Sequence, residues 1–436
     1  MSQTLVKTTS GLIEGFEKEG ILAFNAIPYC QPPTGERRFQ KADPRMTWEG
    51  VFEARGPGFI CPQGKSTLTP AIGSYDVAHN ENCLTLDIRT PSVTGKKPVA
   101  VWIHGGANCF GGGNLPCYDA TTLAKAGDIV IVNINFRLGA FGFLHHPAIS
   151  TVNLAIKDQI TALRWIKTNI EAFGGDPDEI TLFGQSAGAN AIIHLVGLKE
   201  TQGLFHRVIL QSPSIGRGNF KASEALEIGK AMIQALGVEG KVKETIRQRF
   251  MTATSQEILG AMKAIRETCV PKFGNMLFKP VKDEWDTPQR IIEVTVTEAK
   301  ARNLHVMIGT THDEMHGFTL ERSDKVRAIQ EARFDGPANA LAKALNDAGV
   351  AVWKYRFDWK APLSPYDSCH CIELPFVFGT WGAWDDAGML NGMTEDDRIR
   401  LTDVMQTTWI RFIREGRFDE NDWRLYQKES DLRVFL

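Results

Sequence analysis

A five-residue stretch, Gly184-Gln-Ser-Ala-Gly188, constrains the fold of this chain more than any other feature. The apolar run Ile180–Phe183 precedes it, and residues 187–198 follow with the pattern of a helix. Small residues on both sides of a serine let the backbone turn sharply from a strand into a helix, which lifts the hydroxyl above the sheet. An isolated match is usually an ordinary tight turn, but this context favours a nucleophile elbow at Ser186.

Strands and helices alternate along the chain. The pattern predicts strands at Pro98–Ile103, Ile129–Ile134, Ile180–Phe183, Arg207–Gln211, Leu304–Ile308 and Val352–Arg356. It predicts helices over 158–173, stopped by 174–177, and over 394–416, opened by Thr394 and closed by Gly416. This order indicates an α/β fold with a mainly parallel central sheet and helices on both faces.

Domain boundaries leave no mark in the sequence. There is no internal repeat, low-complexity tract or Pro/Ser-rich linker among the 436 residues. We therefore expect a single domain over 1–436, with helical insertions at about 217–300 and 315–350.

Composition excludes several classes of protein. Lys and Arg number 49 against 51 Asp and Glu, with no basic run, so nucleic acid is not expected as a partner. No window approaches 18 consecutive apolar residues and no signal-like segment is present, which predicts no membrane span and a cytoplasmic location. The eight cysteines include no CxxC pair, so they indicate neither a disulfide scaffold nor a zinc ribbon.

A serine nucleophile needs a base and donors for its oxyanion. His104-Gly-Gly-Ala107 follows a predicted strand and offers backbone N–H groups without bulky side chains. Asp313 and Glu314 both follow a later strand, and spacing alone leaves the choice of acid open. His370 lies beyond the next strand and is a candidate base, and this reasoning weighs it about equally against the other nine histidines taken together.

One pattern mimics a metal site. His312 and His316 stand four residues apart, as in a zinc-binding helix, but Asp rather than Glu follows the first histidine. The segment also leaves a strand, so we expect no metal here.

The chain resembles the type-B carboxylesterase and cholinesterase-like family of α/β-hydrolases from about Val6 onward. The resemblance is carried by segments 27–35 with Arg38-Phe39, then 81–86, 101–106, 136–144, 173–177, the elbow, 210–212, 313–314 and 373–379. It implies an α/β-hydrolase fold with a reduced lid region, because the stretch between acid and histidine is short for the family. It implies these roles: Ser186 as nucleophile, Glu314 rather than Asp313 as acid, His370 as base, and Gly106, Ala107 and Ala187 as oxyanion donors.

Departures from the family pattern also inform the interpretation. Ala107 replaces the third glycine of the oxyanion run, which keeps the N–H but restricts the backbone. Gln185 stands where many relatives carry Glu. The resemblance further implies two scaffold ion pairs and a cysteine pair that forms a disulfide in relatives; in a reducing cytoplasm we expect free thiols. These pairs are Arg38 with Glu81, Arg137 with Asp158, and Cys61 with Cys83.

The sequence thus predicts a serine carboxylesterase that acts through an acyl-enzyme, without cofactor or metal. We expect a small-molecule ester as substrate, an open pocket that accepts bulky esters, and a monomer or homodimer. Met276, Phe278 and Phe318 are candidate pocket residues. The alternatives are an amidase or carbamate hydrolase with the same triad, and a non-catalytic binding protein on this fold.

Overall fold

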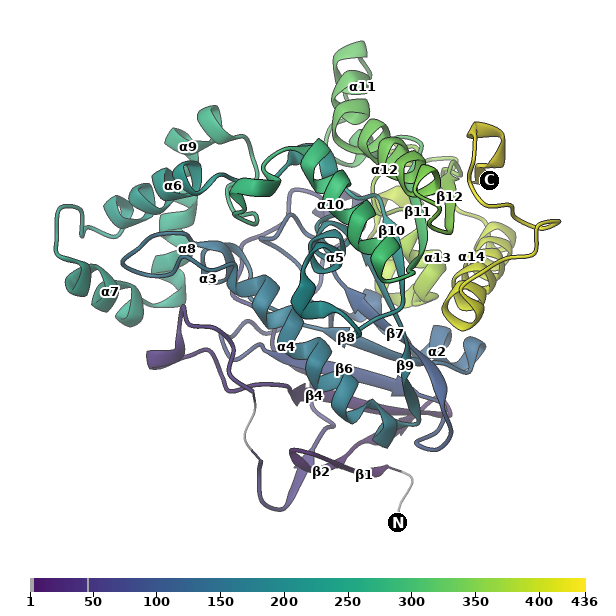
Figure 1. Ribbon diagram of the computed structural model, residues 1–436, viewed down its shortest axis with the longest axis horizontal. Helices are drawn as coiled ribbons and strands as arrows, with labels where there is room; N and C mark the ends of the chain where they lie inside the picture. The colour runs from purple at the N-terminus through teal and green to yellow at the C-terminus, as the bar shows by residue number, and fades with distance from the viewer. Residues whose placement is uncertain (1–3, 45–46) are drawn as a thin grey trace.

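The computed structural model describes residues 4–44 and 47–436. Its centre is a ten-stranded mixed sheet (Figure 1). In spatial order the strands are β13 (Arg433–Phe435), β12 (Val352–Phe357), β11 (His305–Thr311), β10 (Arg207–Gln211), β9 (Gly175–Gln185), β7 (Lys97–Ile103), β8 (Val130–Ile134), β6 (Thr85–Thr90), β4 (Ile21–Pro28) and β3 (Phe16–Lys18). Pairing is parallel from β13 to β8 and antiparallel from β8 to β3, which confirms the predicted α/β class.

The central strands are buried on both faces because their side chains alternate between two hydrophobic cores. In β7, Val99, Val101 and Ile103 belong to one core, whereas Ala100 and Trp102 belong to the other. Successive side chains of a strand point to opposite faces, so a strand covered on both sides reads as a continuous apolar run. This is why the sequence located these strands well.

Helices cover both faces of the sheet, as predicted. The first core takes side chains from α4 (Leu154–Asn169), α5 (Ala187–Gly197), α10 (Pro288–Ala301) and α12 (Gly336–Asp347). The second takes them from α2 (Thr121–Gly127), α13 (Leu374–Phe378) and α14 (Glu395–Glu415). The Thr394 hydroxyl accepts from the N–H of Asp397, and left-handed Gly416 (φ 67°) ends α14, as its caps predict.

Further elements lie outside these layers. Between β10 and β11 the chain forms α6 (Ala222–Ala235), α7 (Lys243–Thr252), α8 (Ser255–Ala264) and α9 (Arg266–Phe273), which extend to the left in Figure 1. Between β11 and β12, α11 (Asp324–Gln330) and a π-helical turn (Glu331–Asp335) precede α12, which itself packs on the sheet. A small sheet joins β1 (Leu5–Thr8), β2 (Gly11–Glu14) and β5 (Val51–Glu53), and two short helices are α1 (Thr69–Ile72) and α3 (Gly139–Phe143). Within the described ranges, no helix combines the length and the apolar character needed to cross a bilayer.

The helix predicted over 158–173 differs from the structure at both ends, and α4 already begins at Leu154. The sequence places a helix stop over 174–177, whereas β9 already begins at Gly175. Gly174 adopts the left-handed conformation (φ 77°) and ends the preceding helical turn by itself, and Gly175 then pairs with Lys97 of β7. The residues after Gly175 are polar, so this end of the strand has no apolar run by which the sequence could show it.

Two buried ion pairs fix the loops beneath the site, as the resemblance implies. Arg38 contacts Glu81 at 2.6 Å and donates to three backbone carbonyls of 250–253. Arg137 contacts Asp158 at 2.5 Å and thereby ties the loop after β8 to α4. Because every donor has an acceptor, these charges hold loop geometry at little desolvation cost.

Candidate active site

Ser186 occupies a strained turn between β9 and α5. Its backbone has φ 56° and ψ −120°, a conformation that a residue with a side chain rarely adopts. Neighbouring glycines are required, because a Cβ atom on Gly188 would lie 1.9 Å from the carbonyl oxygen of Ile103. The N–H of Ser186 donates to the carbonyl of Gln211 at 2.8 Å, which fixes the turn to the end of β10. The elbow therefore stands where the central parallel strands end.

Glu314 and His370 meet although 56 positions separate them. Glu314 follows β11, His370 lies between β12 and α13, and both are at most 1% exposed. Nδ1 of His370 donates to one carboxylate oxygen of Glu314, and the N–H of Thr311 donates to the other at 2.9 Å. The carboxylate thus fixes the ring so that Nε2 carries a lone pair.

Asp313, the alternative acid, faces away from His370. Its carboxylate contacts His312 at 3.0 Å and accepts from the N–H of Ser368 at 3.3 Å. The tertiary structure therefore brings Glu314, not Asp313, to His370.

Gln185 occupies the free side of the imidazole. Its side-chain N–H lies 3.0 Å from Nε2 of His370 and donates to it. In the part of the chain that the structure describes, no hydrogen bond joins the Ser186 hydroxyl to His370. For His370 to take a proton from Ser186, the serine hydroxyl has to replace this amide, and such contacts often tighten only when substrate binds.

Backbone N–H groups converge next to Ser186. The loop after β7 brings Gly105 so close to Ser186 that a Cβ atom added to this glycine would lie 3.2 Å from Cβ of Ser186. Only glycine fits this close approach. Ala107 has φ 54°, so it adopts the left-handed conformation despite its side chain. Among the described residues, the N–H groups of Gly106, Ala107 and Ala187 have no protein acceptor. They are free to bind an oxyanion.

Two phenylalanines flank the imidazole. The ring of Phe318 lies 5.2 Å from that of His370 and its side chain is partly exposed. The ring of Phe334 lies 5.1 Å away and is buried in the π-helical turn. Phe318 is among the pocket residues expected from the sequence, whereas Phe334 is not, because a single phenylalanine in a polar stretch gives no local signal of its position.

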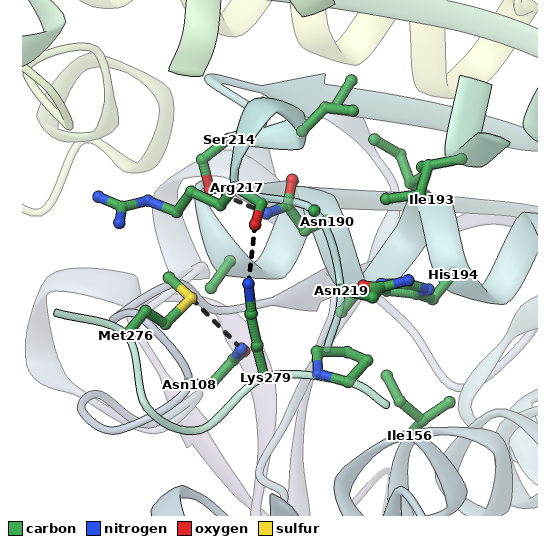
Figure 2. A pocket seen from close by; sticks show the side chains of 16 residues that line it. Asn108, Ile156, Asn190, Ile193, His194, Ser214, Arg217, Asn219, Met276 and Lys279 are labelled. Atoms are coloured by element: carbon green, nitrogen blue, oxygen red, sulfur yellow. Dashed lines mark hydrogen bonds between the residues drawn. The ribbon is translucent and has the colours of Figure 1, made fainter. Parts of the chain in front are cut away.

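A pocket lies beside the elbow, and Figure 2 shows its lining. Its volume is about 450 Å³, counted out to its solvent-exposed mouth. Its lining includes Ala187, Asn108 and Met276, and the Met276 sulfur lies beside the amide of Asn108, 4.0 Å from it. Phe278, expected from the sequence as a pocket residue, does not line this pocket: its side chain packs in the core, and its carbonyl accepts from Asn108 at 3.2 Å.

Two further buried carboxyls lie near Glu314. Burial, and then the charge of Glu314, raise the pKa of Glu373 to about 8. Burial likewise raises the pKa of Asp335 to about 6. Both were missed by the sequence analysis, because a carboxyl reveals burial only in the folded chain. A protonated Glu373 leaves Glu314 as the negative charge that faces His370.

The histidine pair of the zinc-like pattern does not converge. Among the described residues, Asp313, His316 and Asp367 have ligand atoms within 4.8 Å of one another, but His312 is not part of this group. Arg322 contacts Asp367 at 2.6 Å and Lys360 contacts it at 3.3 Å. These cations already neutralise Asp367, so the cluster is better suited to holding the loop than to binding a metal.

Comparison with known proteins places this geometry in context. A model of the carboxylesterase family matches residues 2–335. Para-nitrobenzyl esterase of Bacillus subtilis (strain 168) is 31% identical over 477 residues, which cover 100% of this chain and 95% of the relative. Phenmedipham hydrolase of Pseudarthrobacter oxydans is 34% identical, with 95% and 91% covered. A solved structure of PNB esterase is 31% identical and superposes with a TM-score of 0.85, covering 95% of this chain and 91% of that one.

Proposed function

Because this chain belongs to the carboxylesterase family, we propose that it hydrolyses carboxylic esters with Ser186 as nucleophile, His370 as base and Glu314 as the group that orients the base. The observation that carries these roles is the buried hydrogen bond from His370 to Glu314 beside the strained turn. A serine hydroxyl is a weak nucleophile until such a base removes its proton.

The reaction runs through an acyl-enzyme. Ser186 displaces the Gln185 amide from Nε2 of His370, gives up its proton and attacks the ester carbonyl. The N–H groups of Gly106, Ala107 and Ala187 bind the oxyanion that forms. His370 then protonates the departing alcohol, and water activated by the same imidazole releases the acid.

Glu314 stabilises the imidazolium that forms twice in this cycle. Its second oxygen is already held by the N–H of Thr311, so the carboxylate cannot turn away from His370. Preorganised charges of this kind lower the barrier because they need no rearrangement during the reaction.

Hydrolysis of amides or carbamates is a second candidate. The similarity to a phenmedipham hydrolase supports this candidate. The same three residues would serve whether the leaving group is an alcohol or an amine. Rates for a matched ethyl ester, ethyl carbamate and anilide of one acyl group would separate the candidates. A carbamate or anilide that exceeds the ester in kcat/KM would replace the ester as the proposed substrate.

The test of the nucleophile is covalent. Diethyl p-nitrophenyl phosphate should add one diethylphosphoryl group to the protein, and peptide mass spectrometry should locate it on Ser186. The Ser186→Ala variant should remain unlabelled and lose about 10⁴- to 10⁶-fold in kcat with an unchanged circular dichroism spectrum. A label on another serine, or turnover within tenfold of the wild type, would contradict the assignment.

We further propose that the protein is cytoplasmic and that it is a monomer or a homodimer. The buried thiols of Cys61 and Cys83 are in hydrogen-bond contact, and a reducing compartment would keep such a pair as thiols. Cell fractionation tests the location, and light scattering on the purified protein tests the assembly.

A further inference from the structure

Two arginines beside the pocket carry charges that the protein leaves unpaired. Arg217 ends a 3₁₀ turn (Ile215–Arg217) after β10, and Arg333 stands in the π-helical turn before α12. Both are half-buried. Within the described ranges, neither guanidinium has a carboxylate within 4 Å or a side-chain hydrogen bond. Partly buried charges without partners cost free energy, which an anionic ligand would recover.

The fold presses the two loops together. A Cβ atom on Gly216 would lie 1.9 Å from the carbonyl oxygen of Ala332 and 2.8 Å from Cα of Arg333, so the loops touch through a glycine. Arg333 is near enough for its charge to act on the guanidinium of Arg217. Burial, with the charge of Arg333 as second cause, lowers the pKa of Arg217 to about 10. Both groups remain protonated at neutral pH, so their repulsion persists until an anion arrives.

Neighbouring charges do not relieve the pair. Two acids stand two residues from Arg333: Asp335 accepts from Gln330 at 2.9 Å and lies near Glu314, and Glu331 forms no ion pair among the described residues. Lys279 adds a further cation to the pocket wall: it donates to the carbonyl of Arg217 at 2.8 Å and lies over the ring of Phe220 at 4.2 Å. Lys279 thus holds the turn that carries Arg217.

Arg217 lies at the pocket, and Arg333 is next in the chain to a residue that contacts the catalytic histidine candidate. Arg217 lines the pocket together with Ala187 and Asn108, which adjoin the oxyanion donors. Figure 2 shows its side chain reaching away from Lys279, toward the side of the pocket where Met276 stands. Arg333 precedes Phe334, whose ring contacts His370.

The pocket fits the acyl part of an ester. Its lining includes Ala187, which directly follows Ser186, but includes neither Ser186 itself nor His370. The alcohol has to reach His370 to be protonated, whereas the acyl group stays on Ser186. The acyl group is therefore the part of the substrate that extends along the Ala187 wall.

We infer that Arg217 and Arg333 bind a carboxylate at the far end of the acyl group, so that the preferred substrates are monoesters of dicarboxylic acids. This inference rests on the proposed function. A guanidinium offers two parallel N–H donors that match the two oxygens of a carboxylate, and two such groups can share one anion.

The experiment compares monoethyl adipate with ethyl hexanoate by titration of the released acid. These esters share a six-carbon acyl chain and differ in the terminal carboxylate. The wild type should show the higher kcat/KM for the adipate, and added salt should reduce that value more than the hexanoate value. Monoethyl succinate, glutarate and suberate then measure the distance between the ester and the arginines.

Variants assign the preference to the pair. Arg217→Gln and Arg333→Gln should each lower the adipate-to-hexanoate ratio about 10- to 100-fold, as expected for loss of a charged hydrogen bond. Arg217→Lys should recover part of the ratio, because it keeps the charge and loses the fork. Arg327→Gln, on the exposed surface of α11, is the matched control and should leave the ratio unchanged. Thermal melting shows whether each variant is folded.

The outcomes separate this inference from the proposed function. An unchanged ratio in folded Arg217→Gln and Arg333→Gln, or a wild type that prefers ethyl hexanoate, overturns the inference while esterase activity stands. A preference for acetoxyacetate over ethyl acetate, with no gain for adipate, also overturns it, because the carboxylate then belongs to the alcohol side. Failure of the wild type to hydrolyse any of these esters overturns the proposed function itself.

Discussion

Replacing Glu373 with glutamine should stabilise this protein at neutral pH. Glu373 is fully buried at the start of α13, and one of its carboxyl oxygens accepts from the side chain of Gln211 at 3.2 Å. Among the described residues its other oxygen has no hydrogen-bond partner. Glutamine has the same shape, keeps the accepting oxygen and carries no charge, so the substitution removes mainly the ionisation.

The magnitude follows from the pKa of this carboxyl, which burial and Glu314 raise from 4.5 to about 8 in the folded chain. Between these pH values the folded protein holds a proton that the unfolded chain has released, so stability falls as pH rises. The penalty is absent below about pH 4.5 and complete above about pH 8. At pH 7, 2.5 units above the unfolded value and at about 1.4 kcal/mol per unit, it amounts to about 3 kcal/mol.

Urea denaturation at pH 5 and pH 7 measures this difference. Glu373→Gln should raise the free energy of unfolding by about 3 kcal/mol at pH 7 and by less than about 1 kcal/mol at pH 5. Glu239→Gln, at an exposed turn, controls for the loss of any carboxylate. An equal effect of Glu373→Gln at both pH values, or a loss of stability at pH 7, would refute the reasoning.

Three further outcomes are expected. Glu314→Gln should lower kcat about 10³- to 10⁴-fold, whereas Asp313→Asn should cost less than tenfold, because only Glu314 orients His370; the reverse order in ester assays would reject this acid. Gly188→Ala should destabilise the protein by at least about 1–3 kcal/mol, measured by urea denaturation, because its methyl group would overlap the carbonyl of Ile103; a variant as stable as the wild type would show that the elbow can relax. An open pocket mouth predicts measurable hydrolysis of tert-butyl acetate and a maximum of kcat/KM at short to medium acyl chains. Ethyl, isopropyl and tert-butyl acetates test the alcohol side, and esters with acyl chains of two to sixteen carbons test the acyl side. Undetectable turnover of the tert-butyl ester, or a maximum at sixteen carbons, would contradict the open mouth.

The local pattern around Ser186 predicted the elbow because its cause lies within a few residues. The glycines on either side are needed for the tight turn, and the strand before it shows itself through its apolar run. The helix over 394–416 was equally predictable, since its caps and apolar stripe are local features. By contrast β13, three residues long, is defined only by its pairing with β12 and carries no periodic signal of its own.

The partners of the catalytic candidates were decided by tertiary structure. Spacing left Asp313 and Glu314 equivalent; the resemblance favoured Glu314, and the packing of β11 beside β12 carried that residue to His370. The amide of Gln185 against Nε2 of His370 is a contact between segments 185 positions apart, so no local pattern contains it.

Sequence by itself therefore determined where the main parallel strands lie along the chain, the elbow and the chemical types available for catalysis, because glycine sterics and hydrophobic periodicity act over short distances. Only the folded chain decided that Phe334 contacts His370, that Glu373 lies in a place where it keeps its proton, and that Arg217 and Arg333 approach each other without a carboxylate between them. Each of these depends on how loops after different strands meet at one edge of the sheet. Burial and the distances between charged groups depend on how these loops pack, so a pattern along the sequence does not show them.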